Sequence, residues 1–267
     1  MSAKESAKST REKAAQARAE AEAEQKRRDR TVRVIGAVAV LAIIGAIFGA
    51  VIWNNNKNSS ANDIVNDAAV PKGVFTSTGN YPWGYPVNQA GTKPTLAIWE
   101  DFQCPTCGAV EKANGKTIEQ LASDGKINLI WRPTAFIDEK TSSSGGPNPK
   151  SSLRATAAWG CAIDAGKGPE YHNTVFANQP ANEGDGWTDQ QLIDFGTTAG
   201  ITGAAQATFQ TCVQNNTYHQ WANNSYQTFI KDAVPGTPTA YLDGKEVTLD
   251  VLADPTKLAK AVADATK

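Results

Sequence analysis

Two cysteines separated by two residues, Cys104 and Cys107, are the side chains of this sequence best suited to do chemistry. At the start of a helix, both sulfur atoms would lie on one face and within bonding reach of each other. The unpaired backbone N–H groups and the positive end of the helix dipole stabilise a thiolate at Cys104, and Thr106 is a candidate hydroxyl donor to it. Since a thiolate is both the nucleophile and the leaving group of disulfide exchange, we predict a redox pair with Cys107 as the resolving thiol. A stabilised thiolate favours the reduced form, so the disulfide form is predicted to be an oxidant.

The same cysteine spacing occurs in zinc sites and in structural disulfides, so the surroundings must decide between them. A zinc site needs a second pair of ligands at suitable spacing, and the sequence contains none. The histidines, His172 and His219, are isolated in a stretch of helical composition, which favours a surface or core position over ligation. We therefore expect no metal site.

A strand–helix–strand unit is predicted around the two cysteines. The apolar run at residues 95–99 is bounded by Pro94 and two acidic residues, which is typical of a buried strand. Residues 105–123 have helical composition with a proline at the first position, and residues 127–131 form a second strand. The two strands should be parallel, with a right-handed connection.

The rest of the chain beyond residue 72 is predicted to be mainly helical in its middle. A Ser/Gly/Pro tract at residues 141–149 precedes a long stretch of helical composition without a comparable strand candidate. Three further elements are predicted, namely a short strand near residues 74–76, a β-hairpin of residues 239–242 and 245–249 turning at Asp243-Gly244, and a last helix from about residue 254.

Residues 34–53 are uncharged over their whole length, which matches an α-helix that crosses a membrane. Lys and Arg residues crowd the N-terminal flank of this run, whereas the other flank has only Lys57 nearby. The positive-inside rule then places the N-terminus in the cytoplasm and the remainder of the chain outside. A cleaved signal peptide is the alternative, disfavoured because the run is long and lacks a clear cleavage site. We expect a single-pass protein of the cell membrane.

The charge of the chain is uneven. Residues 1–33 hold 10 basic and 6 acidic side chains, which leaves 16 basic and 21 acidic side chains for the remainder. A mildly acidic body gives no electrostatic reason to bind nucleic acid. A hydrophobic content of 40% with 20% charged residues excludes a disordered or fibrous chain.

Cys161 and Cys212 fall in separate predicted helices, so they cannot form a local redox pair. Disulfides persist outside the cytoplasm, where this part of the chain is expected to lie. We predict a structural disulfide, which would stabilise the fold by about 4 kcal/mol in the chain-entropy model. A second pair that relays disulfides is the alternative.

The run LAIWEDFQCPTC, the helical stretch and the segment VPGTPT at residues 234–239 together resemble the DsbA-like branch of the thioredoxin superfamily. The resemblance implies an α/β thioredoxin fold with an inserted helical domain, here preceded by one N-terminal transmembrane helix. The resemblance implies a cis peptide bond before Pro238, since an X–Pro bond costs little in the cis form. The alternative is an ordinary trans proline that opens a strand. The active-site residues that the resemblance implies are the attacking thiol Cys104, its resolver Cys107, their neighbours Pro105 and Thr106, and a facing loop with Thr237 before the cis-proline Pro238.

The predicted organisation follows from these features. It comprises a charged cytoplasmic tail (1–33), a transmembrane anchor (34–53), a linker (54–71), the first part of the thioredoxin-like domain (72–140), the inserted helical domain (141–230) and the second part of the thioredoxin-like domain (231–267).

One position departs from the family pattern. Many relatives keep a buried carboxylate six residues before the first cysteine to move protons, whereas this sequence has Ile98 there. Glu100 shares the strand face of Ile98 and is one substitute. Asp101 is the other candidate, although its side chain is also suited to begin the helix.

The leading functional hypothesis is an extracytoplasmic dithiol oxidase that passes its disulfide to exported polypeptides with free thiols. The resemblance implies reoxidation by a quinone-linked membrane oxidase. The alternatives are a reductase or isomerase of exported proteins, and a thioredoxin-like chaperone that binds a soft metal through Cys104 and Cys107. No dimerisation module is evident, so we expect a monomer, and no cofactor is expected.

Overall fold

The computed structural model describes residues 64–141 and 146–266. The predicted tail, the predicted membrane anchor and most of the linker lie outside these residues. Within the described part of the chain, no helix combines the length and hydrophobicity that crossing a membrane requires.

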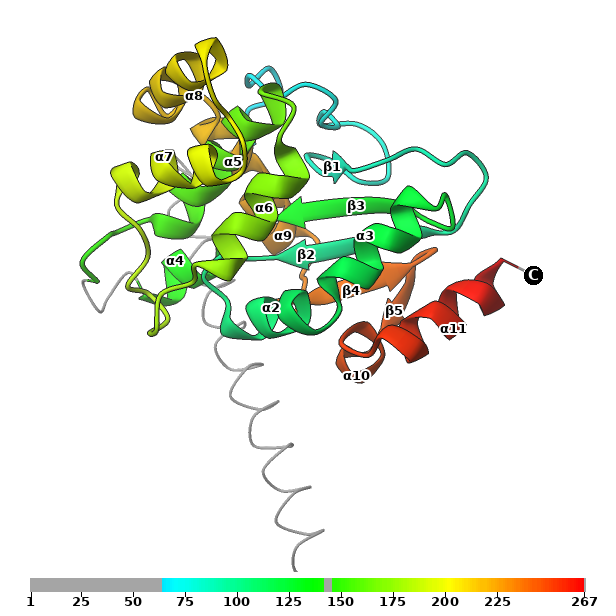
Figure 1. Ribbon diagram of the computed structural model, residues 1–267. Coiled ribbons are helices and arrows are strands. Elements are labelled where there is room, and N and C mark those ends of the chain that lie inside the picture. The colour runs from blue at the N-terminus through cyan, green and yellow to red at the C-terminus, as the bar shows by residue number, and fades with distance from the viewer. Residues whose placement is uncertain (1–63, 142–145, 267) are drawn as a thin grey trace, which may run out of the picture. The chain divides into compact units, whose positions relative to one another are not determined.

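A mixed five-stranded sheet organises the described residues, in the order β1-β3-β2-β4-β5 (Figure 1). β2 pairs in parallel with β3, whereas the other pairings in the sheet are antiparallel. β2 is a central strand, and residues 96–99 are almost completely buried, as expected for a strand covered on both faces. The strands are β1 Tyr85–Pro86, β2 Thr95–Glu100, β3 Asn128–Pro133, β4 Thr239–Leu242 and β5 Lys245–Val247.

A continuous helical segment connects β2 to β3. It consists of α2 Pro105–Val110, the π-helical turn η1 Glu111–Gly115 and α3 Lys116–Ser123. The predicted strand–helix–strand unit is confirmed. The π-helical turn is an addition that the sequence pattern did not predict.

Six described helices lie between β3 and β4. The predicted helical stretch corresponds to α5 to α9, whereas α4 precedes the Ser/Gly/Pro tract and was not predicted. α5 is the central helix of this stretch, because nearly every residue from Ser151 to Ile163 is buried. Figure 1 shows α7 and α8 on the side of α5 and α6 that faces away from the sheet. The helices are α4 Phe136–Thr141, α5 Ser151–Asp164, α6 Gly168–Ala177, α7 Asp189–Thr198, α8 Ala204–Gln214 and α9 His219–Lys231.

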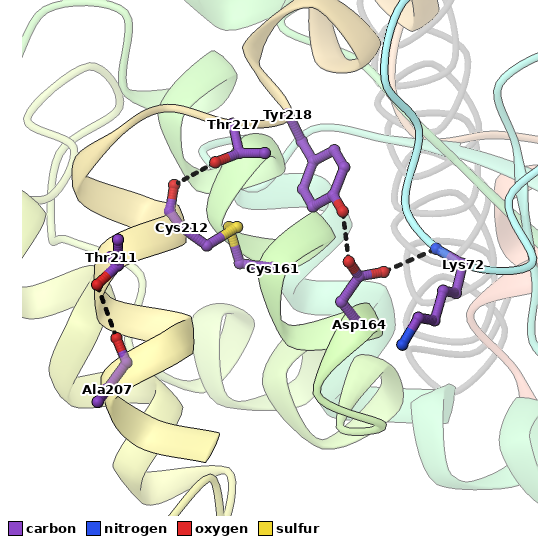
Figure 2. Close-up of a disulfide and its surroundings, with 8 residues drawn as sticks. All are labelled: Lys72, Cys161, Asp164, Ala207, Thr211, Cys212, Thr217 and Tyr218. Atoms are coloured by element: carbon purple, nitrogen blue, oxygen red, sulfur yellow. Dashed lines mark hydrogen bonds between the residues drawn. A yellow bond between two sulfur atoms is a disulfide. The ribbon is translucent and has the colours of Figure 1, made fainter. Parts of the chain in front are cut away.

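A disulfide between Cys161 and Cys212 joins α5 to α8, as the sequence analysis predicts (Figure 2). Cys161 is buried and Cys212 is half-buried. Close to it, Asp164 accepts hydrogen bonds from the Tyr218 hydroxyl and from the backbone N–H of Lys72. The disulfide therefore lies inside a packed junction between helices and the N-terminal lead-in.

The C-terminal part contains the predicted hairpin and two helices. Asp243 and Gly244 both have positive φ angles, 49° and 77°, as a tight two-residue hairpin turn requires. The short α10 Leu249–Leu252 precedes α11 Pro255–Ala265, whose N-cap Asp254 accepts bonds from the N–H groups of Thr256 and Lys257. The predicted last helix is confirmed.

Two strand predictions were wrong. Residues 74–76 form no strand, because Phe75 N donates to Gly84 O and Trp83 N donates to Thr76 O within the lead-in. The edge strand β1 instead forms at residues 85–86, where the missing N–H of the proline is tolerated. The second hairpin strand ends at Val247 and not at residue 249, because α10 begins there and buries Leu252.

Candidate active site

Cys104 and Cys107 lie at the start of the helical segment, directly after β2. Cys104 is the N-cap of α2, with extended backbone angles (φ −72°, ψ 117°), and Pro105 occupies the first helical position. The backbone N–H of Cys104 donates to Asp101 O at 2.9 Å, so the connection from β2 is a tight turn. Both cysteines are free thiols and both are buried.

The two thiols have opposite acidities. The hydrogen bond from the Cys107 thiol lowers the pKa of Cys104 most, and burial opposes it. With the Thr237 side chain and the backbone N–H groups of residues 106 and 107, the pKa of Cys104 falls to about 6. Burial raises the pKa of Cys107 well above its ordinary value, and the hydrogen bond to Cys104 raises it further. At neutral pH Cys104 is therefore mainly a thiolate and Cys107 a thiol.

The loop before β4 closes the site from the other side. The Thr237–Pro238 peptide bond is cis, as the family resemblance implies. In its thiol form, Cys104 donates a hydrogen bond from Sγ to the carbonyl O of Thr237 at 3.3 Å. Ionisation of Cys104 removes this bond, but the hydrogen bonds that the thiolate accepts from the surrounding donors lower the pKa by more than this loss raises it. A segment 133 residues away in sequence thus contacts the reactive sulfur.

Pro105 and Thr106, between the two buried thiols in the sequence, are both exposed. The effect of Thr106 on the Cys104 pKa comes from its backbone N–H, and not from its hydroxyl, which the sequence offered as an additional candidate donor. The backbone dominates because a residue in the first helical turn directs its unpaired N–H toward the N-cap.

The cysteine pair, the facing cis-proline loop and the inserted helices are the features of a known fold, and residues 89–263 match the thioredoxin family. The chain belongs to the thioredoxin family. No curated protein sequence matches this chain significantly.

Solved structures to which this chain is similar include thiol–disulfide exchange proteins of bacteria. MdbA, a thiol-disulfide oxidoreductase from Actinomyces oris, is 24% identical over 77% of this chain and 96% of its own, with a TM-score of 0.60. The disulfide bond oxidoreductase DsbG from Mycobacterium tuberculosis is 22% identical over 78% and 91%, with a TM-score of 0.53. BdbD from Bacillus subtilis is 18% identical over 75% and 99%, with a TM-score of 0.56. The likeness shows a DsbA-like thioredoxin fold with a helical insertion.

The position at which the family resemblance implies a carboxylate holds Ile98, which is completely buried. Glu100, two residues further along β2, supplies a buried carboxyl group and is 5% exposed. Burial raises the pKa of Glu100 to about 8, the interaction with the Glu111 side chain opposes the rise, and the negative charge of Cys104 adds to it. Of the two predicted substitutes, Glu100 is therefore the carboxyl group that is coupled to the cysteines.

Asp101, the other candidate, holds neighbouring segments of the chain together through hydrogen bonds. Its carboxylate accepts hydrogen bonds from Gln103 N at 2.8 Å, Ile137 N at 2.8 Å and Ser152 Oγ at 2.6 Å. These donors belong to the active-site loop, α4 and α5. Asp101 therefore ties the loop that carries the cysteines to the inserted helices.

Two ionisable residues that the sequence analysis did not assign to the site lie beside Glu100. His172 of α6 is 1% exposed, and its Nε2 lies 3.0 Å from Glu100 Oε2. Glu111 of η1 also lies beside Glu100, with a carboxyl oxygen of each within 4.8 Å of the other. The position of Glu111 had a signal, because a residue four after Cys107 lies on the same helix face. His172 had none, since its contact depends on how α6 packs.

Within the described residues, Glu100, Glu111 and His172 form one group whose oxygen and nitrogen atoms lie within 4.8 Å of one another, the separation at which a shared metal is conceivable. The contact between His172 and Glu100 already has the length of a hydrogen bond. The other contacts within the group have no hydrogen bond, since Glu100 Oε1 and Glu111 Oε1 are buried without a partner among the described residues.

Gln179, just beyond α6, was also missed and holds the active-site loop. Its Nε2 donates to Phe102 O at 2.7 Å and to Cys104 O at 3.0 Å. A Cβ at Gly108 would lie 2.0 Å from Gln179 Oε1, so the glycine makes room for this side chain. Beside it, an open groove of about 680 Å³ runs between the helical segment and α6, and its lining includes Pro105, Glu111, Lys112, Phe176 and Gln179.

Proposed function

We propose that this chain is a membrane-anchored, extracytoplasmic dithiol oxidase that introduces disulfides into exported polypeptides through Cys104 and Cys107. The observation that carries the proposal is the difference in acidity between the two sulfurs. The pKa of Cys104 is lowered to about 6, whereas that of Cys107 is raised well above its ordinary value. Family membership and fold support an activity in thiol–disulfide exchange.

The reaction starts from the Cys104–Cys107 disulfide. A substrate thiolate attacks Cys104 Sγ, the S–S bond between the two cysteines breaks, and Cys107 leaves and takes up a proton. A second thiolate of the substrate then attacks the substrate sulfur of the mixed disulfide. Cys104 leaves as a thiolate, which its low pKa favours, and the substrate keeps the new disulfide.

The direction of transfer follows from the stability of the product thiolate. With a pKa of about 6 for Cys104 and an ordinary value of about 8.5, ionisation at pH 7 favours the reduced enzyme about tenfold. A tenfold change corresponds to about 30 mV for this two-electron couple. The enzyme therefore gives its disulfide away more readily than an unperturbed dithiol pair does.

The location outside the cytoplasm rests on the sequence. The uncharged run at residues 34–53 is an anchor in this proposal, with the basic residues before it on the cytoplasmic side. The Cys161–Cys212 disulfide fits an oxidising compartment. A quinone-linked oxidase of the membrane is the proposed partner that restores the Cys104–Cys107 disulfide.

A Cys107→Ala variant tests the proposal, because it arrests the mixed disulfide on Cys104. The full-length variant is expressed in its own compartment, and the covalently captured proteins are identified after trapping free thiols. Capture of many different exported polypeptides is expected, and the double variant that also carries Cys104→Ala should capture none.

The reduction potential provides the second test. An oxidase is expected to have a potential well above the value of about −270 mV that characterises the reductant thioredoxin. A potential near that value, together with capture of a single partner, would favour the reductase and overturn the oxidase direction. Tight stoichiometric copper binding without disulfide exchange would favour the metal chaperone.

A further inference from the structure

Three potential metal ligands from distant parts of the sequence meet inside the described fold. Glu100 of β2, Glu111 of η1 and His172 of α6 each offer one oxygen or nitrogen atom, and these atoms lie within 4.8 Å of one another. Glu100 is 5% exposed, His172 is 1% exposed and Glu111 is half-buried. The sequence analysis expected no metal site, because the spacing of residues along the chain cannot reveal ligands that three separate elements contribute.

The two carboxyl groups of this cluster have oxygen atoms that the surrounding protein does not satisfy. Glu100 Oε1 and Glu111 Oε1 are both buried, and neither has a hydrogen-bond partner among the described residues. Buried polar atoms without a partner are rare in native proteins, because they have lost their contacts with water and gained none in return. Both oxygen atoms are therefore available to a ligand that enters the cluster.

A positive charge is the kind of ligand that this cluster lacks. Among the ion pairs of the described residues, neither carboxyl group is paired with a lysine or an arginine. Arg132, which lines a small void together with Glu100, instead contacts Asp232 at 3.5 Å and lies 3.8 Å from the centroid of the Trp99 ring. Burial of a carboxylate without a counter-ion is unfavourable, and a divalent cation would supply the missing charge.

The types of ligand select zinc among the divalent cations. Two carboxylate oxygens and one imidazole nitrogen correspond to the three protein ligands of an open zinc site, whose fourth position holds water. Calcium and magnesium prefer oxygen ligands, and copper(I) prefers sulfur. Ligand atoms that surround zinc tetrahedrally at about 2.1 Å lie about 3.4 Å apart, and His172 Nε2 lies 3.0 Å from Glu100 Oε2. This pair therefore needs to open only slightly to take up the ion.

His172 is held in the orientation that a zinc ligand needs. Asn173 Nδ2 donates to Glu119 Oε1 at 2.8 Å, which turns Asn173 Oδ1 toward His172 Nδ1 at 3.4 Å. This network assigns the ring proton to Nδ1 and leaves the lone pair of Nε2 facing Glu100. The ring also stacks on Trp131, with ring centroids 3.9 Å apart. Histidines that bind zinc are commonly fixed by a hydrogen bond from their other ring nitrogen.

Glu111 connects the cluster to solvent and gives an ion a route of entry. It lines the open groove of about 680 Å³, whereas Glu100 and His172 line a small void of about 10 Å³. A Cβ at Gly115 would lie 2.3 Å from Glu111 Oε2, so the glycine leaves the space that this carboxyl group occupies. Glu111 is also the first residue of the π-helical turn, a distortion that is frequent at functional sites.

We propose that Glu100, Glu111 and His172 form a binding site for Zn²⁺, with a water molecule on the groove side as the fourth ligand. The bound ion joins the thioredoxin-like part to the inserted helices, because β2 and η1 supply two ligands and α6 supplies the third. The site uses neither Cys104 nor Cys107. It is therefore distinct from the metal chaperone considered above, and it is independent of the direction of disulfide exchange.

Zinc binding to the full-length oxidised protein is the direct test, because Cys104 and Cys107 then form a disulfide and offer no thiolate to a metal. Isothermal titration calorimetry of the untagged, metal-free protein is expected to show saturation with one Zn²⁺ per chain at micromolar zinc. Cobalt(II) in place of zinc should give the intense visible absorption of tetrahedral coordination without a cobalt–thiolate band. Absence of saturation up to millimolar zinc would overturn the site.

Three variants make the titration specific. Glu111→Gln keeps the size of the side chain but removes its charge, so it should weaken zinc binding at least about tenfold. Gly115→Ala keeps all three ligands but displaces the Glu111 carboxyl group, and it should also weaken binding. Glu170→Gln removes an exposed carboxylate from the helix that carries His172, so it is the matched control and should bind like the wild type. If Glu111→Gln and Gly115→Ala bind zinc as tightly as this control, the assignment is wrong.

Thermal unfolding of the oxidised protein provides a second measurement. Zinc at about 100 times its dissociation constant should raise the unfolding midpoint of the wild type by about 5 °C or more, since the ion binds the folded state. Glu111→Gln should lose most of this shift, and absence of a shift in the wild type would overturn the site. If the reduction potential is that of a reductase while the oxidised protein binds zinc, the oxidase direction fails and the metal site stands.

Discussion

The two cysteine pairs of this chain occupy opposite chemical states in two parts of one fold. Cys104 and Cys107 lie within a single helical turn of the thioredoxin-like part and are free thiols. Cys161 and Cys212 lie in two different helices of the insertion and form a disulfide across a sequence separation of 51 residues. The same side chain is reactive in one place and structural in the other.

The difference teaches that the surroundings of the sulfur decide its role. Around Cys104, hydrogen-bond donors from Cys107, Thr237 and the helix start stabilise a thiolate. Around Cys212, Figure 2 shows helix packing, and its backbone carbonyl accepts the Thr217 hydroxyl at 3.2 Å. The first pair gains its character from electrostatics and the second from closing a long loop.

The largest effect is expected for Cys104→Ala, which removes the reactive thiol. Removal of the nucleophile should reduce oxidation of a reduced, unfolded substrate protein to the uncatalysed rate, a loss on the order of a thousandfold or more. The stability of the reduced protein at pH 7 should fall by about 1.4 kcal/mol, because the contribution of the thiolate is lost. The rate at which the substrate protein regains its activity in an oxidative refolding assay measures the effect. Substantial residual turnover would show that another residue is the nucleophile.

The reciprocal change is the double variant Cys161→Ala/Cys212→Ala. Loss of the long closed loop should lower the free energy of unfolding by about 4 kcal/mol, or less if the reduced chain retains structure. Urea denaturation measures this. Turnover per folded molecule should stay near that of the wild type, and a loss of turnover without a loss of stability would instead indicate a relay of disulfides.

The junction between the two parts is expected to be sensitive at Asp101. In Asp101→Asn, an NH2 group replaces one carboxylate oxygen. This donor then faces other donors, either the N–H groups of Gln103 and Ile137 or the hydroxyl of Ser152. The unfavourable contact should cost about 2 to 3 kcal/mol of unfolding free energy. A cost near zero, measured by the same denaturation, would mean that the junction does not depend on this carboxylate.

The pH dependence of the reduced protein should report the acidity of Cys104. Its folded pKa, about 6, lies below the unfolded value of about 8.5. The thiolate therefore stabilises the fold fully above the unfolded pKa, and this contribution is lost as the pH falls through about 6. At pH 7 it amounts to about 1.4 kcal/mol relative to Cys104→Ser. If the pH midpoint for alkylation of Cys104 is that of a free cysteine, electrostatics do not explain the difference between the two cysteine pairs.

The smallest effect is expected on the exposed surface of the insertion. Lys167 and Glu170 form an exposed ion pair one helical turn apart, at 2.9 Å. Lys167→Ala should change the free energy of unfolding by less than about 0.5 kcal/mol, because water and salt screen such pairs. A larger loss would show that the long methylene chain of Lys167 packs against the fold.

Local patterns predicted much of this architecture because their physics is contained in a few consecutive residues. A proline after Cys104 starts a helix, and an Asp-Gly pair turns a hairpin, with the positive φ angles that those residues accept. The prediction of a strand at residues 74–76 was wrong because it used only this local pattern. Its apolar residues fitted a strand, but the partners of its N–H groups were decided by the packing of the lead-in.

The sequence by itself determined the reactive cysteine pair, the order of the main elements and the identity of the residues available for a structural disulfide. Only the tertiary structure decided that Glu100, Glu111 and His172 meet, that Gln179 holds the cysteine loop, and that Asp101 joins the two parts. The reason is physical. Helix starts and turns depend on neighbouring residues, whereas a buried hydrogen bond depends on which distant surfaces exclude water together.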